Sequence, residues 1–268
     1  MQDAGSFKRK IRTFYRSQGR DLPWRRTRDP YRILVSEIML QQTQVDRVKS
    51  FYENFIKRFP DIKSLAHAKK SDVLRAWQGL GYNRRALSLR ETARIVTEEY
   101  GGALPRERET LESFPGIGPY TAGAIRAFAF GEPEVFIETN IRRVFIHFFF
   151  SRRDEVGDHE ILPLVEKTLD RKDPRAWYFA LMDYGAMLGV AAEINPNRRS
   201  AHYVRQSKFI GSDREIRGKI LRLVLARKKM TMDELVDAIP QPKDRIMKIT
   251  VALSREGFLK KRSNMISL

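Results

Sequence analysis

The stretch Phe114–Ala124, FPGIGPYTAGA, decides the fold of this chain. A helical pattern over 108–114 ends at the proline that follows it, and a second helix is expected to start near Tyr120. Gly116 and Gly118 can adopt the left-handed backbone conformations that other residues reach only at a cost. A turn of this kind presents backbone N–H groups at a helix N-terminus, where they bind one phosphate. The stretch alone predicts either a hairpin that grips nucleic acid backbone or an ordinary tight turn between packed helices.

Outward from this stretch, helical patterns occupy most of the chain before residue 210. Proline and glycine separate the segments, and alternating strand patterns are scarce. The sequence therefore predicts an all-α body. Apolar residues recur at three- and four-residue spacing in 31–58, 71–78, 85–100, 108–114, 120–130, 140–150, 159–169 and 174–190.

The pattern changes in the last quarter of the chain. Residues 196–212 are basic and polar without periodicity, which predicts a linker. Residues 213–268 predict a helix, a shorter helix with Thr231 as its N-cap, a longer helix and a short terminal hairpin. That order is typical of a winged helix-turn-helix domain. The basic charge of this region favours nucleic acid as its partner, while a role in dimerising the protein stays open.

Composition points to a polyanionic partner and excludes several classes of site. The chain has 51 Lys and Arg against 33 Asp and Glu, a formal net charge of +18. Without any cysteine it cannot form disulfides, thiolate zinc sites or cysteine-held iron–sulfur clusters, and we expect no cofactor and no metal. No apolar run approaches the roughly 20 residues of a membrane helix, and no signal-peptide core is present. We expect a monomeric, cytoplasmic, nucleoid-associated protein that makes no membrane contact.

The neighbours of the hairpin resemble a known superfamily. LESFPGIGPYTAGAIRAFAFG is similar to the helix-hairpin-helix of the base-excision DNA glycosylases related to endonuclease III. RDLPWRRTRDPYRILVSEIMLQQTQV (20–45) and WQGLGYNRRALSL (77–89) resemble the MutY adenine glycosylase branch, although mismatch thymine glycosylases share part of the first segment. The resemblance implies a two-lobed glycosylase domain over 1–195. One lobe of six helices would span about 30–135, and the other would combine 1–29 with 136–195.

The resemblance implies two catalytic carboxylates. Glu37 lies inside an apolar helical stretch, where an unpaired carboxylate tends to have a raised pKa that suits a general acid. In the family, the matching Glu protonates the purine ring. Glu138 stands where the family has an Asp, and its carboxylate would stabilise positive charge on the deoxyribose. The alternative for Glu138 is that Thr139 caps the helix and Glu138 only favours its dipole.

Tyr120 occupies the hairpin position where strand-cutting relatives carry a Lys that forms a Schiff base. The resemblance therefore implies a monofunctional glycosylase with weak or no lyase activity. It also assigns a base pocket and a DNA-binding set, although simple packing could explain single members. The pocket positions are Arg20, Leu22, Trp24, Arg25, Leu40, Val45 and Asp183. The DNA-binding positions are Gln41, Gln42, Tyr82, Gly116, Ile117, Gly118, Thr121, Arg198 and Arg199.

Two parts of the family are missing from this sequence. The segment GVAAEINPNRRSAHY (189–203) stands at the place of the four-cysteine cluster loop, and the basic residues Arg198, Arg199, His202 and Arg205 are interpreted as its metal-free substitute. The domain that recognises 8-oxoguanine is replaced by the winged-helix candidate. The preferred hypothesis is removal of adenine opposite 8-oxoguanine or guanine in double-stranded DNA, leaving an abasic site. The alternatives are a thymine or uracil mismatch glycosylase and a non-catalytic DNA-binding protein on a glycosylase scaffold.

Overall fold

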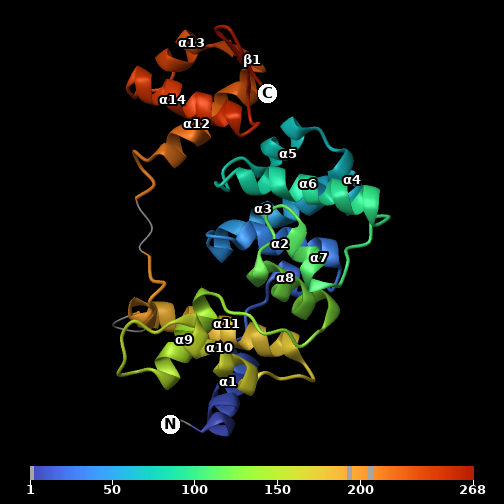
Figure 1. The fold of residues 1–268 in the computed structure, drawn as a ribbon, viewed down its shortest axis with the longest axis vertical. Coiled ribbons are helices and arrows are strands. Elements are labelled where there is room, and N and C mark those ends of the chain that lie inside the picture. Colours follow the sequence, from blue (N-terminus) through green and yellow to red (C-terminus); the bar gives the residue numbers. More distant parts are fainter. Residues whose placement is uncertain (1–2, 192–194, 205–207) are drawn as a thin grey trace. The chain divides into compact units, whose positions relative to one another are not determined.

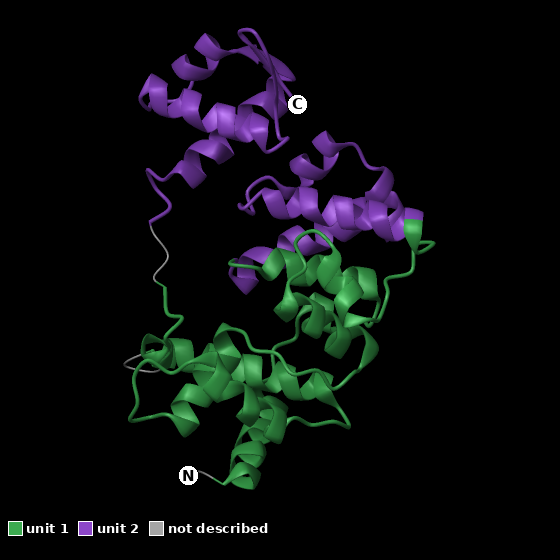
Figure 2. Cartoon of the chain, in the orientation of Figure 1, with its two compact units in different colours: residues 1–42, 99–205 green, residues 43–98, 206–268 purple. Residues whose placement is uncertain are grey.

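The computed structural model describes residues 3–191, 195–204 and 208–268. Figure 1 shows the helices and strands of the chain. The chain divides into two compact units, which Figure 2 shows in different colours. Unit 1 contains residues 1–42 and 99–205, and unit 2 contains residues 43–98 and 206–268. These units group the chain differently from the boundaries at 195 and 213, which stay a prediction. Within the described residues, no helix combines the length and the hydropathy that crossing a bilayer requires.

The helices of unit 1 agree with the predicted all-α body, and its described residues contain no strand beyond an isolated bridge between Val156 and Ser200. Its helices are α1 Ala4–Gln18, α2 Pro30–Leu40, α7 Arg108–Ser113, α8 Pro119–Ile125, α9 Thr139–Phe149, α10 Asp158–Thr168 and α11 Pro174–Ala191. Three short helical turns complete it: η1 Pro23–Arg25, η2 Arg126–Phe130 and η3 Pro196–Arg199. Helix α11 packs against both α1 and α9, while α2 and α7 pack against α8.

Aromatic side chains hold α1 against the rest of unit 1. Phe7 is fully buried, and its ring lies 5.1–5.9 Å from four other aromatic rings. Those rings belong to α9 and α11: Phe145, Phe148, Phe149 and Trp177. Burying a ring of this size contributes roughly 2–3 kcal/mol. The basic residues of α1 are therefore carried on a helix whose apolar stripe is anchored in the core.

Unit 2 combines four helices from the middle of the chain with the C-terminal region. The first group is α3 Val45–Arg58, α4 Ile62–His67, α5 Lys70–Trp77 and α6 Arg84–Glu99. The second is α12 Asp213–Arg227, β1 Lys229–Thr231, α13 Met232–Asp237, α14 Lys243–Arg255, β2 Lys260–Arg262 and β3 Met265–Ser267. In the first group, Phe55 and Trp77 pack edge to face with ring centroids 5.8 Å apart.

The C-terminal region has the element order predicted for a winged helix. Its antiparallel sheet has the order β1-β3-β2, with Ile266 of β3 opposite both Met230 and Lys261. Thr231 caps α13 by accepting a hydrogen bond from the backbone of Glu234, which confirms the predicted N-cap. The terminal hairpin of β2 and β3 was predicted from the sequence, whereas β1 was not. This strand has only three residues, too few for an alternating pattern to be recognised.

The apolar pattern over 31–58 forms two helices instead of one continuous segment. Helix α2 ends at Leu40, and α3 begins at Val45. Gln42, between them, has φ of 53°, a left-handed conformation that interrupts a right-handed helix. Apolar periodicity continues across the break because both helices bury one face, so the pattern alone does not reveal the turn.

Candidate active site

The hairpin forms as predicted, with one difference at its second glycine. Gly116 has φ of 83°, the left-handed conformation expected for it. Gly118 has φ of −101° and ψ of −179°, so it is extended and does not use its conformational freedom. Ile117, between the two glycines, is buried. Gly118 is the N-cap of α8 without a capping side chain, and a Cβ there would meet open space. A helix start left uncovered in this way is suited to close approach by a phosphate.

Gln41 connects the end of α2 to this hairpin. Its side-chain amide donates to the carbonyl oxygen of Gly116 at 3.1 Å and to the hydroxyl of Thr121 at 3.2 Å. Thr121 is buried. Gln42, which follows Gln41 in the chain, is exposed. Four of the predicted DNA-binding positions thus lie on one connected part of unit 1.

Glu37 is a buried carboxyl group on α2. Its residue is 3% exposed, and Asp29 fixes the start of the helix by capping the backbone of Tyr31 and Arg32. The pKa of Glu37 is raised to about 7, chiefly by burial. A hydrogen bond from Tyr120 and the charge of Arg25 oppose this rise, and the nearby Glu138 adds to it. A carboxyl group that is still protonated near neutral pH can donate a proton to a leaving group.

Tyr120 joins the hairpin to this acid. Its hydroxyl donates a hydrogen bond of 2.8 Å to Oε2 of Glu37, and its ring packs edge to face on Phe136. Burial and the neighbouring carboxylates Glu37 and Glu138 raise the pKa of Tyr120 well above its usual value. The phenol therefore stays protonated and can act only as a neutral donor at physiological pH.

Glu138 is the N-cap of α9. Its Oε1 accepts from the backbone N–H groups of Asn140 at 2.8 Å and Ile141 at 2.9 Å, and its Oε2 accepts from the Asn140 side chain at 3.2 Å. The alternative in which Thr139 caps this helix is therefore wrong, because Thr139 is already the first helical residue. Burial raises the pKa of Glu138 above its usual value, and these backbone bonds and the charges of Arg143 and Arg142 offset only part of the rise.

Asp183 of α11 holds two arginines of the predicted base pocket. Arg25 donates to both carboxylate oxygens at 2.7 and 2.8 Å, and Arg20 donates through its backbone N–H at 2.8 Å and its Nε at 2.6 Å. Burial alone would raise the pKa of Asp183, but the bonds from Arg25 and Arg20 lower it below the usual value. With two donors on each oxygen, this carboxylate serves to fix the arginines.

The remaining pocket positions divide between the two units. Leu22 and Trp24 are buried beside Arg25 in and next to η1, and Leu40 is half-buried at the end of α2. Val45, the last pocket position, belongs to unit 2, as does Tyr82, which is a predicted DNA-binding position. Tyr82 has φ of 46° and accepts a hydrogen bond of 2.7 Å from Arg214.

The basic segment after α11 is held by hydrogen bonds. Asn197 donates from its side chain to the carbonyl of Thr139 at 2.9 Å, and Arg199 donates to the carbonyl of Ser151. Arg198 and His202 are exposed, while Arg205 lies outside the described residues. Because the chain has no cysteine, this segment does not fit a cysteine-held iron–sulfur cluster. Among the described residues, no group of three or more His, Asp or Glu is arranged to hold a metal ion.

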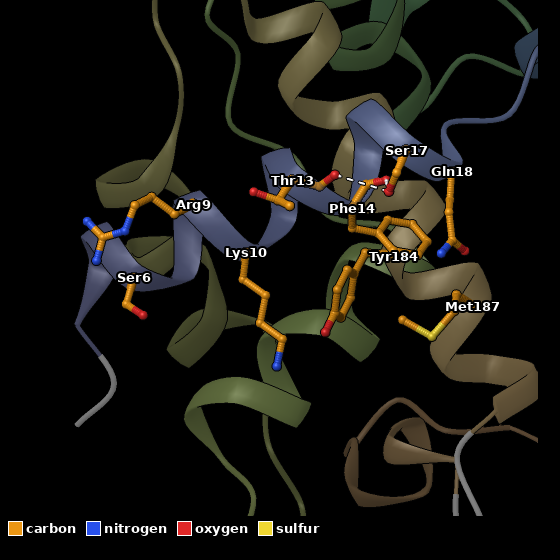
Figure 3. A pocket seen from close by; sticks show the side chains of 9 residues that line it. All are labelled: Ser6, Arg9, Lys10, Thr13, Phe14, Ser17, Gln18, Tyr184 and Met187. Atoms are coloured by element: carbon orange, nitrogen blue, oxygen red, sulfur yellow. Dashed lines mark hydrogen bonds between the residues drawn. The ribbon is translucent and has the colours of Figure 1, made fainter.

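A surface groove of about 550 Å³ lies between α1 and α11, away from both candidate catalytic carboxylates. Figure 3 shows Lys10 and Tyr184 pointing into it from the two helices. Its lining contains none of the predicted catalytic or DNA-binding residues. The groove therefore does not coincide with the predicted catalytic residues Glu37, Tyr120 and Glu138.

Two residues of α9, Asn140 and Arg143, are connected to Glu138 by hydrogen bonds and were not predicted as site residues. Asn140 contacts Glu138 directly, and Arg143 Nη1 donates to Asn140 Oδ1 at 2.8 Å. Residues three apart share one face of a helix, so the spacing of Asn140 and Arg143 after Glu138 was an available signal.

Comparison with known proteins agrees with this arrangement. Residues 35–168 match the model of the HhH-GPD superfamily base excision DNA repair proteins. The chain is 38% identical to the adenine DNA glycosylase of Mycolicibacterium smegmatis, over 78% of this chain and 77% of that protein. It is 35% identical to the thymine/uracil-DNA glycosylase of Methanothermobacter thermautotrophicus, over 70% of this chain and 89% of that protein.

The fold agrees as well. A solved structure of a thermostable thymine-DNA glycosylase superposes with a TM-score of 0.62 at 31% identity, covering 74% of this chain and 95% of that one. The family model spans the hairpin and both candidate carboxylates. The chain thus belongs to the HhH-GPD superfamily of base excision DNA repair proteins, and it is a DNA glycosylase.

Proposed function

We propose that this glycosylase flips a mispaired base from duplex DNA and hydrolyses its N-glycosidic bond, with adenine opposite 8-oxoguanine or guanine as its preferred target. The observation that carries the proposal is Glu37, a buried carboxyl group with a pKa of about 7 beside Tyr120. A base within the duplex stack cannot be reached, so extrusion precedes the chemistry. The net charge of +18 supports attraction to DNA, and we extend the proposal to a monomer that works on the nucleoid.

The reaction follows from the different protonation states of the two carboxyl groups. Protonated Glu37 donates its proton to the base as the C1′–N bond breaks and the bonding electron pair leaves with the base. Ionised Glu138 stabilises the positive charge that develops on the sugar. Water then adds to C1′, and its proton passes to the Glu37 carboxylate, which restores the acid. Burial is the main cause of the raised pKa of Glu37 and the negative charge of Glu138 adds to it, so an ionised Glu138 favours a protonated Glu37.

Adenine is preferred because adenine DNA glycosylases are prominent among the similar proteins. The first of them aligns over most of both chains. Thymine or uracil mispaired with guanine is the second candidate. It is favoured by the equally extensive alignment with the thymine/uracil-DNA glycosylase and by the structural match to a thymine-DNA glycosylase.

The test is a panel of labelled duplexes carrying A:8-oxoG, A:G, T:G, U:G or a hypoxanthine pair, treated with alkali after incubation. We expect cleavage of A:8-oxoG and A:G, with Glu37→Gln as the inactive control. Cleavage of T:G and U:G alone would replace the adenine proposal by the second candidate. Absence of cleavage on every duplex, with binding retained, would leave a DNA-binding protein on a glycosylase scaffold.

The same proposal assigns a monofunctional reaction. Tyr120 stands at the hairpin position and uses its hydroxyl on Glu37, so this side chain offers no amine to the sugar. Borohydride trapping should yield little covalent DNA adduct with the native protein and more with Tyr120→Lys. Strong trapping by the native protein would identify another lysine as nucleophile and overturn the monofunctional assignment.

A further inference from the structure

We propose that Arg143 positions the Glu138 carboxylate through Asn140, and that Asn195, in the segment after α11, holds Arg143 in place. The inference deepens the proposed function and rests on the role assigned there to Glu138. Arg143 is a positioning residue in this account, because the structure gives it no contact with the Glu138 side chain itself.

The side-chain amide of Asn140 is held in one orientation by hydrogen bonds on both of its ends. Its Nδ2 donates to Glu138 Oε2 at 3.2 Å, while its Oδ1 accepts from Arg143 Nη1 at 2.8 Å. A guanidinium can only donate, so this bond turns the amide oxygen toward Arg143 and the amide nitrogen toward the carboxylate. Without Arg143, the amide would be free to turn its oxygen toward Glu138, which would repel the ionised form.

Two further acceptors, a backbone carbonyl and a side-chain amide, hold the guanidinium of Arg143 in place. Arg143 Nη1 also donates to the carbonyl of Gly185 at 2.6 Å, and its Nε donates to Asn195 Oδ1 at 3.0 Å. Gly185 lies where α11 crosses α9, and a Cβ at this position would collide with the backbone of Asn140. The close approach of α9 and α11 therefore brings the carbonyl of Gly185 within hydrogen-bond distance of the Arg143 guanidinium.

The contact of Arg143 with Asn195 lies in the segment that replaces the cluster loop. Asn195 Oδ1 also accepts from the backbone N–H of Asn197 at 3.1 Å, and Asn197 ties the segment to the carbonyl of Thr139. Two amide side chains thus join residues 195–197 to the first turns of α9. Hydrogen bonds from residues 195–197 thus support the N-terminal end of α9, where Glu138 lies.

The charges around Glu138 give the inference its measurable consequence. Glu37 of α2 and Tyr120 of α8 face the same site, and Arg142 and Arg143 of α9 contribute positive charge. Arg142 is neutralised by a bidentate pair with Asp158 at 2.7 Å. Arg143 has no such carboxylate pair among the interactions of the described residues, and of the two arginines it is the one that lowers the pKa of Glu138 more. Activity should therefore fall as pH drops through the Glu138 pKa, and loss of Arg143 should move this acidic limb to higher pH.

The experiment compares single-turnover pH–rate profiles of the full-length native protein with Arg143→Met, Arg143→Lys, Asn195→Ala and Asn195→Asp. Arg153→Met, which removes an exposed arginine paired with Glu160, is the matched control. We expect Arg143→Met to slow the reaction tenfold to a hundredfold, which is the scale of a misplaced catalytic group. The acidic limb of its pH–rate profile should move to higher pH. The alkaline limb set by Glu37 and the affinity for mismatched duplex should stay as in the native protein.

Arg143→Lys keeps the charge but not the fork, so we expect a slower rate with the acidic limb near its native position. Asn195→Ala should share the effect of Arg143→Met in smaller degree. Asn195→Asp keeps the acceptor for Arg143 but pairs its charge with a carboxylate, so we expect a rate closer to the native one than in Asn195→Ala and an acidic limb at higher pH. If Arg143→Met fails to fold, the Lys and Asn195 variants carry the test. Native rates and limbs in the Arg143→Lys and Asn195→Ala variants would overturn the inference. A native rate in Glu138→Gln would instead overturn the proposed role of Glu138.

Discussion

The hydroxyl of Tyr120 donates a hydrogen bond of 2.8 Å to Oε2 of Glu37, and this bond joins the hairpin to the buried acid. A donor to a carboxylate stabilises the ionised form, so Tyr120 lowers the pKa of Glu37 while burial raises it. The balance sets the pKa of Glu37 to about 7, so near neutral pH the carboxyl group can both hold and release a proton.

Tyr120→Phe should move the alkaline limb of the pH–rate profile to higher pH. The variant keeps the ring on Phe136 but loses the donor that opposes the burial effect. Single-turnover rates on the preferred duplex across pH 5–9 measure this limb. An alkaline limb that stays in place, or moves to lower pH, would mean that the bond does not tune the acid.

Glu37→Gln should stabilise the protein in alkaline solution. The folded-state pKa of Glu37 is about 7, above the unfolded value near 4.5, so its contribution to stability is present at low pH and is lost as pH rises to about 7. Relative to the variant, the native protein should lose roughly 3 kcal/mol of unfolding free energy between pH 4 and pH 8. Urea titrations at the two pH values give this difference. If the unfolding free energies of the two proteins differed by the same amount at pH 4 and at pH 8, Glu37 would not be a buried, neutral group.

Glu138→Asp should be slower than the native enzyme, although it restores the residue typical of the family. The longer Glu side chain caps two backbone N–H groups and reaches the Asn140 amide at once. A shorter carboxylate would lose part of this set, and we expect about a tenfold lower single-turnover rate, equivalent to ~1.4 kcal/mol. Asp is a good N-cap, so thermal stability should be kept, which separates the effect from unfolding. A variant as fast as the native enzyme, or faster, would identify Glu138 as a drifted remnant.

The wing of the C-terminal region should contribute to DNA binding through charge. Lys260, Lys261 and Arg262 form β2, and all three are exposed. If each neutralises a phosphate, replacing all three by Ala should reduce the slope of log affinity against log salt by up to about 3. Arg94→Ala is the control, since Arg94 is exposed but paired with Glu91 and Glu98. An unchanged slope in the triple variant would exclude the wing and favour the dimerisation alternative.

The features that the sequence could predict are those with a local signature. Glu37 stands out as a carboxylate inside an apolar helical stretch, and Gly116 and Gly118 mark the turn of the hairpin. Thr231 precedes a helical pattern with Glu234 three residues later, which predicts a capping box. In each case the evidence lies within one or two helical turns of the residue.

The contacts that escaped prediction join distant parts of the chain. Arg25 and Asp183 are 158 residues apart, and Arg143 and Asn195 are 52 apart. No periodic pattern encodes such pairs, because they depend on tertiary packing: of η1 with α11 in the first case, and of α9 with the segment after α11 in the second. The left-handed turn at Gln42 escaped for another reason: glutamine has no special preference for that conformation, so the sequence carries no signal for it.

The central claim is that Glu37 is the acid that protonates the departing base. It is tested most directly by the single-turnover pH–rate profile of Glu37→Gln on an A:8-oxoG duplex, beside the native protein. The account predicts a native rate that falls above about pH 7, and a variant slower by about a hundredfold or more, with no alkaline limb and nearly unchanged duplex binding. A variant that matches the native rate, or that keeps the alkaline limb, would contradict it.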